Sequence, residues 1–162
     1  MQHQTKHLFF ILLPLLLGVG LSSCTSSEGA VWAEHGQLHT HEGPYFIKGV
    51  CYHPVAIGEE QRSFASLTED LAIMREMGVN TIRVYEPIVS EAVLDEISAA
   101  GLSVIIGFGY NQGGVYDLKS GTYLDYVRTF KSHPAILLWE LGNEYNYHPE
   151  WFDGSLEVWY ET

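Results

Sequence analysis

Segments with two different apolar periodicities alternate along most of this chain. Four short runs have the length and composition of buried strands: 46–52, 79–85, 102–108 and 135–141. Between them, apolar residues recur at helical spacing in three segments: 66–78, 90–101 and 122–132. Strand–helix alternation with short connections predicts an α/β fold built from parallel βαβ units. The order alone does not separate an open, doubly wound sheet from a closed barrel.

Local signals mark where these elements begin and end. Residues 66–69 read Ser-Leu-Thr-Glu and match the capping box, which satisfies backbone N–H groups at a helix start. Gly78 and Gly101 follow the last apolar positions of the first two helices, where glycine commonly ends a helix. Two strand-like stretches, 31–33 and 45–47, flank a group of turn residues. We therefore expect an introductory hairpin before the first parallel strand.

The first 23 residues resemble an export signal. Residues 8–20 are apolar except for Pro14, and the run is shorter than the roughly 20 residues that span a bilayer. The run leads into residues 21–24, Leu-Ser-Ser-Cys, which resemble the lipobox of bacterial lipoproteins. That resemblance implies cleavage before Cys24 and lipidation of Cys24; an ordinary signal peptide is the alternative. We expect an exported lipoprotein, membrane-anchored through the Cys24 lipid, on the periplasmic side or the cell surface.

Charge and cysteine content narrow the function classes. The chain has 8 basic and 20 acidic residues and a net charge of −12. This balance argues against nucleic acid, which requires a basic footprint, and against anionic lipid surfaces. If Cys24 carries a lipid, Cys51 has no disulfide partner, and we expect Cys51 to be a small buried apolar residue. Neither G-x-G-x-x-G after the first strand nor zinc-ligand spacing is present, so no cofactor is implied.

The run from Leu137 to Tyr145, Leu-Leu-Trp-Glu-Leu-Gly-Asn-Glu-Tyr, carries the strongest chemical signal. It predicts a buried strand that ends at Gly142 and then presents Asn143 and Glu144. Barrels of parallel strands place their catalytic groups at the carboxyl ends of the strands. A glutamate at such a position suits the proton donor of glycoside hydrolysis.

Four segments together resemble the first half of a (β/α)₈ glycoside hydrolase of clan A. They are Phe-Ile-Lys-Gly-Val at 46–50 with Tyr52, Gly-Val-Asn-Thr-Ile-Arg-Val-Tyr at 78–85, Gly-Leu-Ser-Val-Ile at 101–105, and Trp-Glu-Leu-Gly-Asn-Glu at 139–144. The pattern is similar to the catalytic barrel of glycoside hydrolase family 2, to family 5 cellulase-like barrels and to family 72 β-1,3-glucanosyltransferases. The resemblance implies a TIM barrel of which only about the first four βα units are present.

The resemblance also implies roles for three residues. Glu144 would be the general acid/base, protonated to donate to the leaving oxygen and later ionised to activate water. Asn143 would hydrogen-bond the sugar 2-hydroxyl. Arg83 resembles the arginine that positions the nucleophile; here it could instead be unpaired, pair with Glu140, Glu144 or Glu86, or form a purely structural salt bridge.

Residues at the ends of the other strands are further candidates for sugar contact. Tyr52 and His53 end the first strand, Tyr85 ends the second, and Tyr110 follows the third, where family 5 members often have histidine. Packing at the barrel rim is the alternative for each of them. Within the fourth strand, we expect Glu140 to point into the barrel below the site and not to act as the nucleophile.

We divide the chain into a signal peptide at 1–23, a tether and the start of the hairpin at 24–40, and the truncated N-terminal part of a barrel at 41–162. A complete barrel takes about 250 residues, and retaining hydrolysis needs two carboxyl groups about 5 Å apart. The resemblance places the nucleophilic glutamate on the seventh strand. We therefore expect a retaining β-glycosidase or transglycosidase acting on oligo- or polysaccharides, inactive as this chain unless a complementary half-barrel chain joins it. A non-catalytic carbohydrate-binding or structural surface lipoprotein is the competing interpretation.

Overall fold

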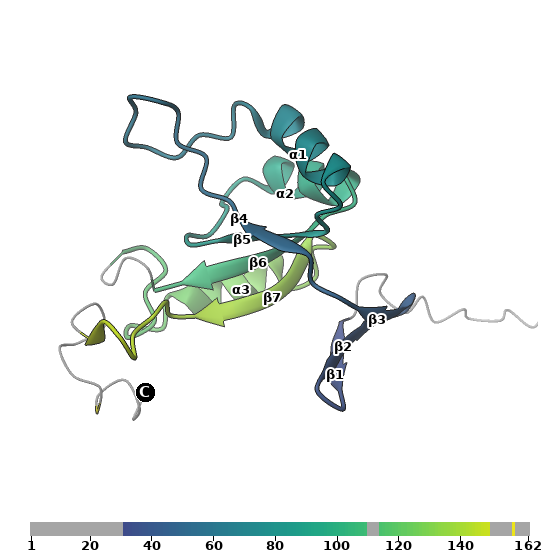
Figure 1. Cartoon of the computed structure of the whole chain (residues 1–162). Helices are drawn as coiled ribbons and strands as arrows, with labels where there is room; N and C mark the ends of the chain where they lie inside the picture. Colours follow the sequence, from purple (N-terminus) through teal and green to yellow (C-terminus); the bar gives the residue numbers. More distant parts are fainter. Residues whose placement is uncertain (1–30, 110–113, 150–156, 158–162) are drawn as a thin grey trace, which may run out of the picture.

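The computed structural model describes residues 31–109, 114–149 and 157. Its strands form two sheets (Figure 1). The antiparallel sheet contains β1 (Trp32–Glu34), β2 (Gln37–Thr40) and β3 (Gly43–Tyr45), and the parallel sheet contains β4 (Gly49–Cys51), β5 (Thr81–Val84), β6 (Ser103–Phe108) and β7 (Ile136–Leu141). The helices are α1 (Leu67–Glu76), α2 (Glu91–Ala99) and α3 (Tyr123–Phe130). None of them combines the length and apolar character needed to cross a membrane.

The parallel sheet has the simple order β4-β5-β6-β7, with one helix in each connection. This arrangement confirms the prediction of an α/β fold built from successive parallel βαβ units. The register pairs Val50 with Ile82 and Ile82 with Val104, so these residues face the same side of the sheet. Because all four strands run in one direction, their carboxyl ends meet at a single edge.

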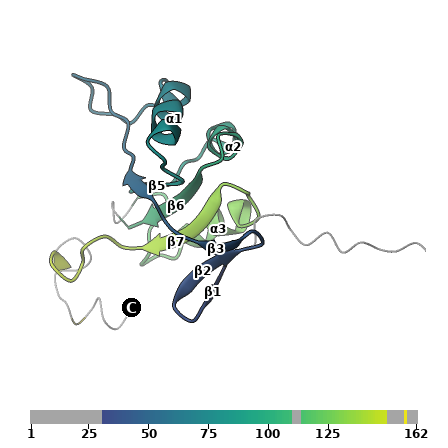
Figure 2. The ribbon, with the colours of Figure 1, turned by 45° about the vertical axis from the view of Figure 1, so that its right-hand side comes forward.

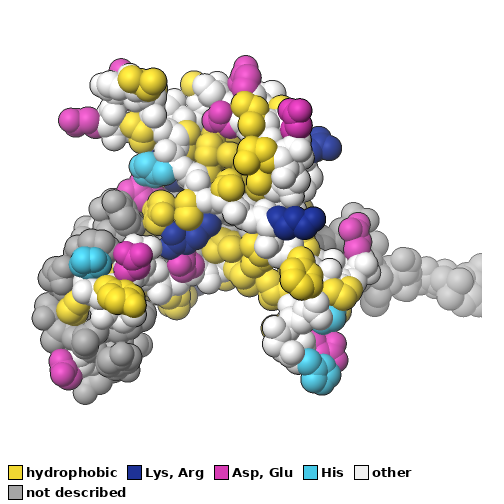
Figure 3. Space-filling view, in the orientation of Figure 1, with side chains coloured by type: hydrophobic (Ala, Val, Ile, Leu, Met, Phe, Trp, Pro, Cys, Tyr) yellow, Lys and Arg dark blue, Asp and Glu magenta, His cyan; other side chains and the backbone are white. Residues whose placement is uncertain are grey.

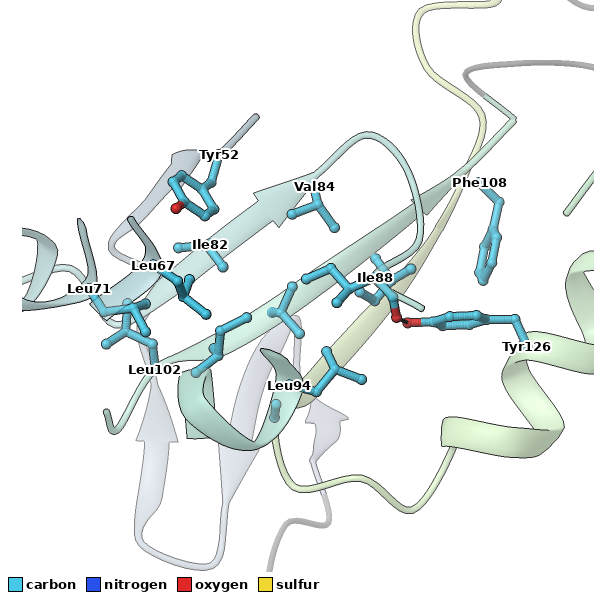
Figure 4. Close-up of a cluster of buried hydrophobic side chains, with 14 residues drawn as sticks. Tyr52, Leu67, Leu71, Ile82, Val84, Ile88, Leu94, Leu102, Phe108 and Tyr126 are labelled. Carbon is cyan, nitrogen blue, oxygen red and sulfur yellow. Dashed lines mark hydrogen bonds between the residues drawn. The ribbon is translucent and has the colours of Figure 1, made fainter. Parts of the chain in front are cut away.

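One face of this sheet carries the hydrophobic core (Figure 4). Ile82, Val84, Val104 and Ile106 are fully buried there, in one cluster with apolar side chains of all three helices. The helix residues of this cluster are Leu67 and Leu71 of α1, Leu94 and Ile97 of α2, and Tyr126 of α3. Strand residues between the core positions point the opposite way, so Arg83 and Glu140 lie on the face that is remote from the helices.

The introductory segment forms three antiparallel strands and not the expected two: β1 and β3 each pair with β2, and residues 46–47 lie outside β3. These three strands lie near the amino ends of the parallel strands, away from their carboxyl ends (Figure 1), and they lie below β7 in the view of Figure 2. The hydroxyl of Tyr45 donates to the carbonyl of Asn80 at 3.0 Å and lies 2.9 Å from Thr81 Oγ1. The Asn80 side chain accepts from Lys48 N at 2.8 Å and donates to the carbonyl of Phe46 at 2.7 Å. Asn80 therefore fixes the entry to β4.

Several local expectations are corrected. The first parallel strand is shorter than 46–52, because Phe46 and Ile47 are exposed and precede β4. Ser66 makes no side-chain capping hydrogen bond, so the expected capping box does not form. In the third predicted helix, 122–132, apolar spacing favours Leu124 as a buried position, but Leu124 is 39% exposed and the deeply buried side chain of α3 is Tyr126.

Candidate functional site

An ion pair joins two strands that are not neighbours. Arg83 of β5 donates through Nε to Oε2 and through Nη2 to Oε1 of Glu140 of β7, both at 2.7 Å. The two side chains are 24% and 32% exposed. The hydrogen bonds with Glu140 raise the pKa of the Arg83 guanidinium above its ordinary value. Of the partners considered for Arg83 from the sequence, Glu140 is the one that the structure shows.

Gly107 of β6 lies beside this ion pair. In the register of the sheet, Gly107 lies beside Glu140, on the strand between β5 and β7. A Cβ atom at position 107 would lie 2.7 Å from the Val84 carbonyl oxygen and 3.4 Å from Glu140 Oε2. A Cβ atom here would therefore crowd the backbone of β5, and a longer side chain would enter the space beside the Glu140 carboxylate. A glycine inside an apolar strand is the sequence signal that could have revealed this close approach.

Arg83 also holds Asn143, the residue that precedes the candidate acid. Its Nη2 atom donates to Asn143 Oδ1 at 2.8 Å, in addition to its bond with Glu140. Within residues 31–109 and 114–149, no hydrogen bond is found for the Nδ2 group of Asn143. Two of the predicted site residues, Arg83 and Asn143, are thus brought together.

Tyr85 and Cys51 complete the surroundings of Arg83. The guanidinium lies over the Tyr85 ring, 4.5 Å from its centroid, and Arg83 Nη1 is 3.8 Å from Cys51 Sγ. A hydrogen bond with Tyr85 and the nearby Arg83 lower the pKa of the Cys51 thiol. The expectation that Cys51 is buried is wrong: Cys51 is exposed, because it lies on the sheet face remote from the helices. His53 is exposed and faces the Tyr85 ring edge-on, with 6.4 Å between centroids.

Glu144 lies in a turn directly after β7 and is exposed. Its φ angle is 55°, in the left-handed region that residues other than glycine and asparagine rarely adopt. Its carbonyl accepts from Tyr147 N at 2.9 Å and from His148 N at 2.8 Å. This turn holds a strained conformation at the residue proposed for chemistry, as functional sites often do.

Gly142 and Tyr145 fix the start of this turn. Gly142 has φ 86° and donates to the Phe108 carbonyl at 2.8 Å. A Cβ atom at Gly142 would lie 2.6 Å from the Tyr145 ring, so only glycine admits the ring here. The Tyr145 hydroxyl donates to the Gly109 carbonyl, and the side chain is buried. Tyr145 therefore anchors the Asn143–Glu144 segment to the end of β6.

A cavity of about 310 Å³ opens beside this cluster, at the carboxyl ends of β5 and β6. Its lining includes Tyr85, whose ring also contacts the Arg83 guanidinium, and Arg62, which was not predicted as a site residue from the sequence. Arg62 donates to the carbonyls of Glu86 and Pro87, each at 2.7 Å. Glu86 and Pro87 also line the cavity, together with Val89, Gly109, Gly114, Val115 and Tyr116. The volume is at the lower end of the range of small-molecule sites.

The other predicted site residues fall elsewhere. Tyr52 is corrected: its side chain belongs to the core, and its hydroxyl donates to Asp70 Oδ2 of α1 at 2.7 Å. Trp139 also packs in the aromatic core, stacked on Phe108 at 5.9 Å. Tyr110 and Cys24 lie outside the described residues.

Two other ligand classes, metal ions and nucleic acid, can be compared with the described residues. Among them, no group of three or more His, Cys, Asp or Glu side chains is arranged to hold a metal ion. On the face drawn in Figure 3, the Lys and Arg side chains lie singly among apolar and acidic ones. The drawn face therefore shows no extended basic surface of the kind that nucleic acid requires.

Comparison with known proteins gives structural neighbours only. No protein-family model and no curated protein matches the chain. The β-glucuronidase of Parabacteroides merdae aligns with a TM-score of 0.51 and 25% identity, over 68% of this chain and 14% of its own. The GH2 β-galacturonidase of Eisenbergiella tayi, solved with galacturonate bound, aligns with a TM-score of 0.54 and 22% identity, over 70% of this chain and 22% of its own. These neighbours are glycosidases and support a relation to glycoside hydrolases; this chain spans less than a quarter of either.

Proposed function

We propose that this chain carries the acid/base side of a retaining β-glycoside-processing site, with Glu144 as proton donor and Asn143 as a sugar-hydroxyl ligand. The single observation behind the proposal is the placement of Asn143 and Glu144 directly after β7, with Asn143 held by the Arg83–Glu140 pair. The edge formed by the carboxyl ends of the strands is where parallel α/β folds bind their ligands. Glycosidases as structural neighbours support the same reaction class.

The proposed fold is the first four βα units of a TIM barrel, formed within residues 41–162. Two observations support it: the strands follow one another in sequence order, and all three helices contribute to the core on one face of the sheet. The second face would then be the barrel interior, which would explain why it carries the Arg83–Glu140 pair. Residues 24–40 would form the tether and the start of the antiparallel sheet.

In this proposal, Glu140 is not the nucleophile. Both of its carboxylate oxygens accept hydrogen bonds from Arg83. Retaining chemistry requires a second carboxyl group about 5 Å from the acid/base. A further strand would supply that group, from the same polypeptide or from a complementary half-barrel chain, and the isolated 162-residue chain would then be inactive. Hydrolysis and transfer to another sugar both fit this site.

We further propose export as a lipoprotein, with residues 1–23 removed and Cys24 lipidated. The support is the apolar run followed by Leu-Ser-Ser-Cys at 21–24. A Cys24→Ser variant is expected to stay uncleaved at this position and to leave the membrane fraction of a bacterial host that makes lipoproteins. Membrane association that persists in Cys24→Ser would contradict this part of the proposal.

A second candidate function is carbohydrate binding without catalysis by a surface lipoprotein. One observation favours it: Glu144 is exposed, so the described residues do not shield it from water as a catalytic acid is commonly shielded. The two functions differ in what they require of Glu144. Catalysis needs its proton, whereas simple binding needs at most its shape and hydrogen-bonding capacity.

Two probes separate these functions without requiring turnover. Methyl β-D-glucopyranoside tests sugar binding alone, and a glucose-derived fused imidazole places a basic nitrogen where a glycosidic oxygen would lie. If Glu144 is a positioned acid, Glu144→Gln should weaken imidazole binding about tenfold or more and leave methyl glucoside binding unchanged. Glu91→Gln, an exposed glutamate at the start of α2, is the matched control. Unchanged affinity for both probes in Glu144→Gln would favour the binding-only function, and no binding of either probe would contradict both.

A further inference from the structure

The contacts of Arg83 connect the Glu140 carboxylate to the amide of Asn143. We propose that Glu140 is a positioning residue: it holds the Arg83 guanidinium, and Arg83 in turn holds the amide of Asn143 in one orientation. The inference rests on the proposed function in that Asn143 is taken to contact the sugar. It adds a role for Glu140, which lies within β7, one residue before the strand ends, and not in the turn that follows.

Arg83 determines which end of the Asn143 amide is available. A guanidinium can donate hydrogen bonds but cannot accept them. Arg83 Nη2 is 2.8 Å from Asn143 Oδ1, so the flipped amide would place an N–H group against an N–H group. The Nδ2 hydrogens are therefore the end left to donate. Such a site selects an acceptor oxygen on its ligand, as a sugar hydroxyl provides.

Glu140 determines where Arg83 lies. The two 2.7 Å bonds to one carboxylate fix both the position and the plane of the guanidinium. The Tyr85 ring supports the same plane from one side, at 4.5 Å. Arg83 is still 24% exposed, so without the charge of Glu140 its long side chain could turn toward water. Asn143 would then lose the donor that orients it.

The geometry across the sheet makes this chain of contacts specific. Glu140 lies in β7 and Asn143 lies two residues after the end of this strand, whereas Arg83 comes from β5; the side chains meet beside Gly107 of β6. Arg83 Nη2 donates to both Glu140 and Asn143, so one nitrogen carries the coupling. A shift of this nitrogen would affect the Asn143 amide directly.

A measurement without ligand tests the positioning itself. In ¹⁵N-labelled protein, the side-chain amide signals of Asn143 are assigned by their loss in Asn143→Ala. Glu140→Gln keeps the shape of residue 140 but removes its charge, and it should shift these signals and speed their exchange with water. Glu91→Gln, an exposed glutamate on α2, should leave them unchanged. A dispersed amide spectrum shows that each variant is folded; unchanged Asn143 signals in folded Glu140→Gln would overturn the proposal.

A second measurement asks whether the effect on a sugar passes through Asn143. The probe is methyl β-D-glucopyranoside, titrated into four proteins: the unmodified chain, Glu140→Gln, Asn143→Ala and the double variant. Glu140→Gln is expected to weaken binding about tenfold in the unmodified background and to change nothing further in Asn143→Ala. Equal weakening in both backgrounds would overturn the proposal, because a general structural defect would not depend on Asn143. If the unmodified chain does not bind the probe, the proposed function fails, and the ligand-free amide signals decide the positioning role alone.

Discussion

Arg83 on β5 and Glu140 on β7 are joined by two 2.7 Å hydrogen bonds that cross the intervening strand β6. The pair lies on the sheet face opposite the helix-covered core, and less than a third of either side chain is exposed. Removing one member of such a pair leaves a partly desolvated charge without its partner. Stability and the order of the candidate site therefore depend on the same contact.

Glu140→Ala should lower the free energy of unfolding by about 2 kcal/mol, because it leaves the Arg83 guanidinium without its charged partner. Arg128→Ala is the control: Arg128 pairs with Asp125 at 2.6 Å on α3, but both side chains are mostly exposed. We expect the control to cost less than about 0.5 kcal/mol. Urea unfolding followed by circular dichroism measures both. Equal losses for the two variants would contradict a special role for the Arg83–Glu140 pair.

Gly107→Ala should destabilise the fold by about 1–3 kcal/mol, because the added methyl group would lie 2.7 Å from the Val84 carbonyl oxygen. The matched change is Gly49→Ala on the edge strand β4, where the nearest atoms are 3.2 Å away. Thermal unfolding of the two variants should show the larger drop in Tm for Gly107→Ala. A drop of the same size in Gly49→Ala would contradict this reason, because it would show that any glycine replaced in these strands carries the same cost.

Cys51 should react with iodoacetamide faster than an ordinary exposed cysteine at mildly alkaline pH. Its pKa is lowered by the hydrogen bond with Tyr85 and by Arg83, so more of the reactive thiolate is present at a given pH. Tyr85→Phe removes the first of these causes and should move the pH–rate profile to higher pH. The measurement uses a Cys24→Ser background, so that Cys51 is the thiol followed. An unchanged profile in Tyr85→Phe would contradict the assignment of the cause.

Tyr126→Phe should cost about 1–2 kcal/mol of unfolding free energy, because the buried hydroxyl donates to the Ile88 carbonyl at 2.7 Å. Tyr123→Phe on the same helix is the control and should change little, since no hydrogen bond is found for the Tyr123 hydroxyl within the described residues. Denaturant titrations of the two variants, analysed with a shared slope, compare these costs.

The Tyr126 side chain also makes the free energy of unfolding depend on pH. Burial raises the pKa of Tyr126 above its ordinary value, so the folded state favours the protonated hydroxyl. The stabilisation is complete below the unfolded-state pKa of about 10 and declines as the pH rises above it. Tyr126→Phe should therefore flatten part of the alkaline fall in stability. An alkaline branch identical in the variant would contradict this origin.

The order of the elements could be predicted from the sequence because periodicity reports which face of each segment is apolar. The alternation in residues 46–141 predicted parallel βαβ units, and the strands at 81–84 and 103–108 fall inside their expected ranges. The prediction of a capping box was wrong, because the Ser66 side chain makes no capping hydrogen bond at the start of α1. Tyr52 was expected at the site and lies in the core, whereas Cys51 was expected in the core and is exposed. Both errors have one cause: β4 has three residues, too few for the sequence to show which of them face the helices.

The candidate site was only partly accessible to sequence reasoning. The Asn143–Glu144 pair could be identified because it follows an apolar run that ends at Gly142. The contact of Arg83 with Asn143 could not be deduced, because it depends on the register of three strands. The contribution of Arg62 to the cavity wall likewise depends on how the segment after β4 folds back over the end of β5.

The measurement closest to the central claim is a titration of ¹⁵N-labelled protein with methyl β-D-glucopyranoside. We predict that the backbone amides of residues 142–145 and the Asn143 side-chain amide shift together, and that Asn143→Ala weakens the binding about tenfold. Ile73 and Met77 provide the internal comparison: they line a second hollow of about 440 Å³ beside α1, whose lining also includes Cys51 and His53 near the candidate site. Shifts confined to Ile73 and Met77, or no shifts after Gly142, would contradict a sugar site at the end of β7.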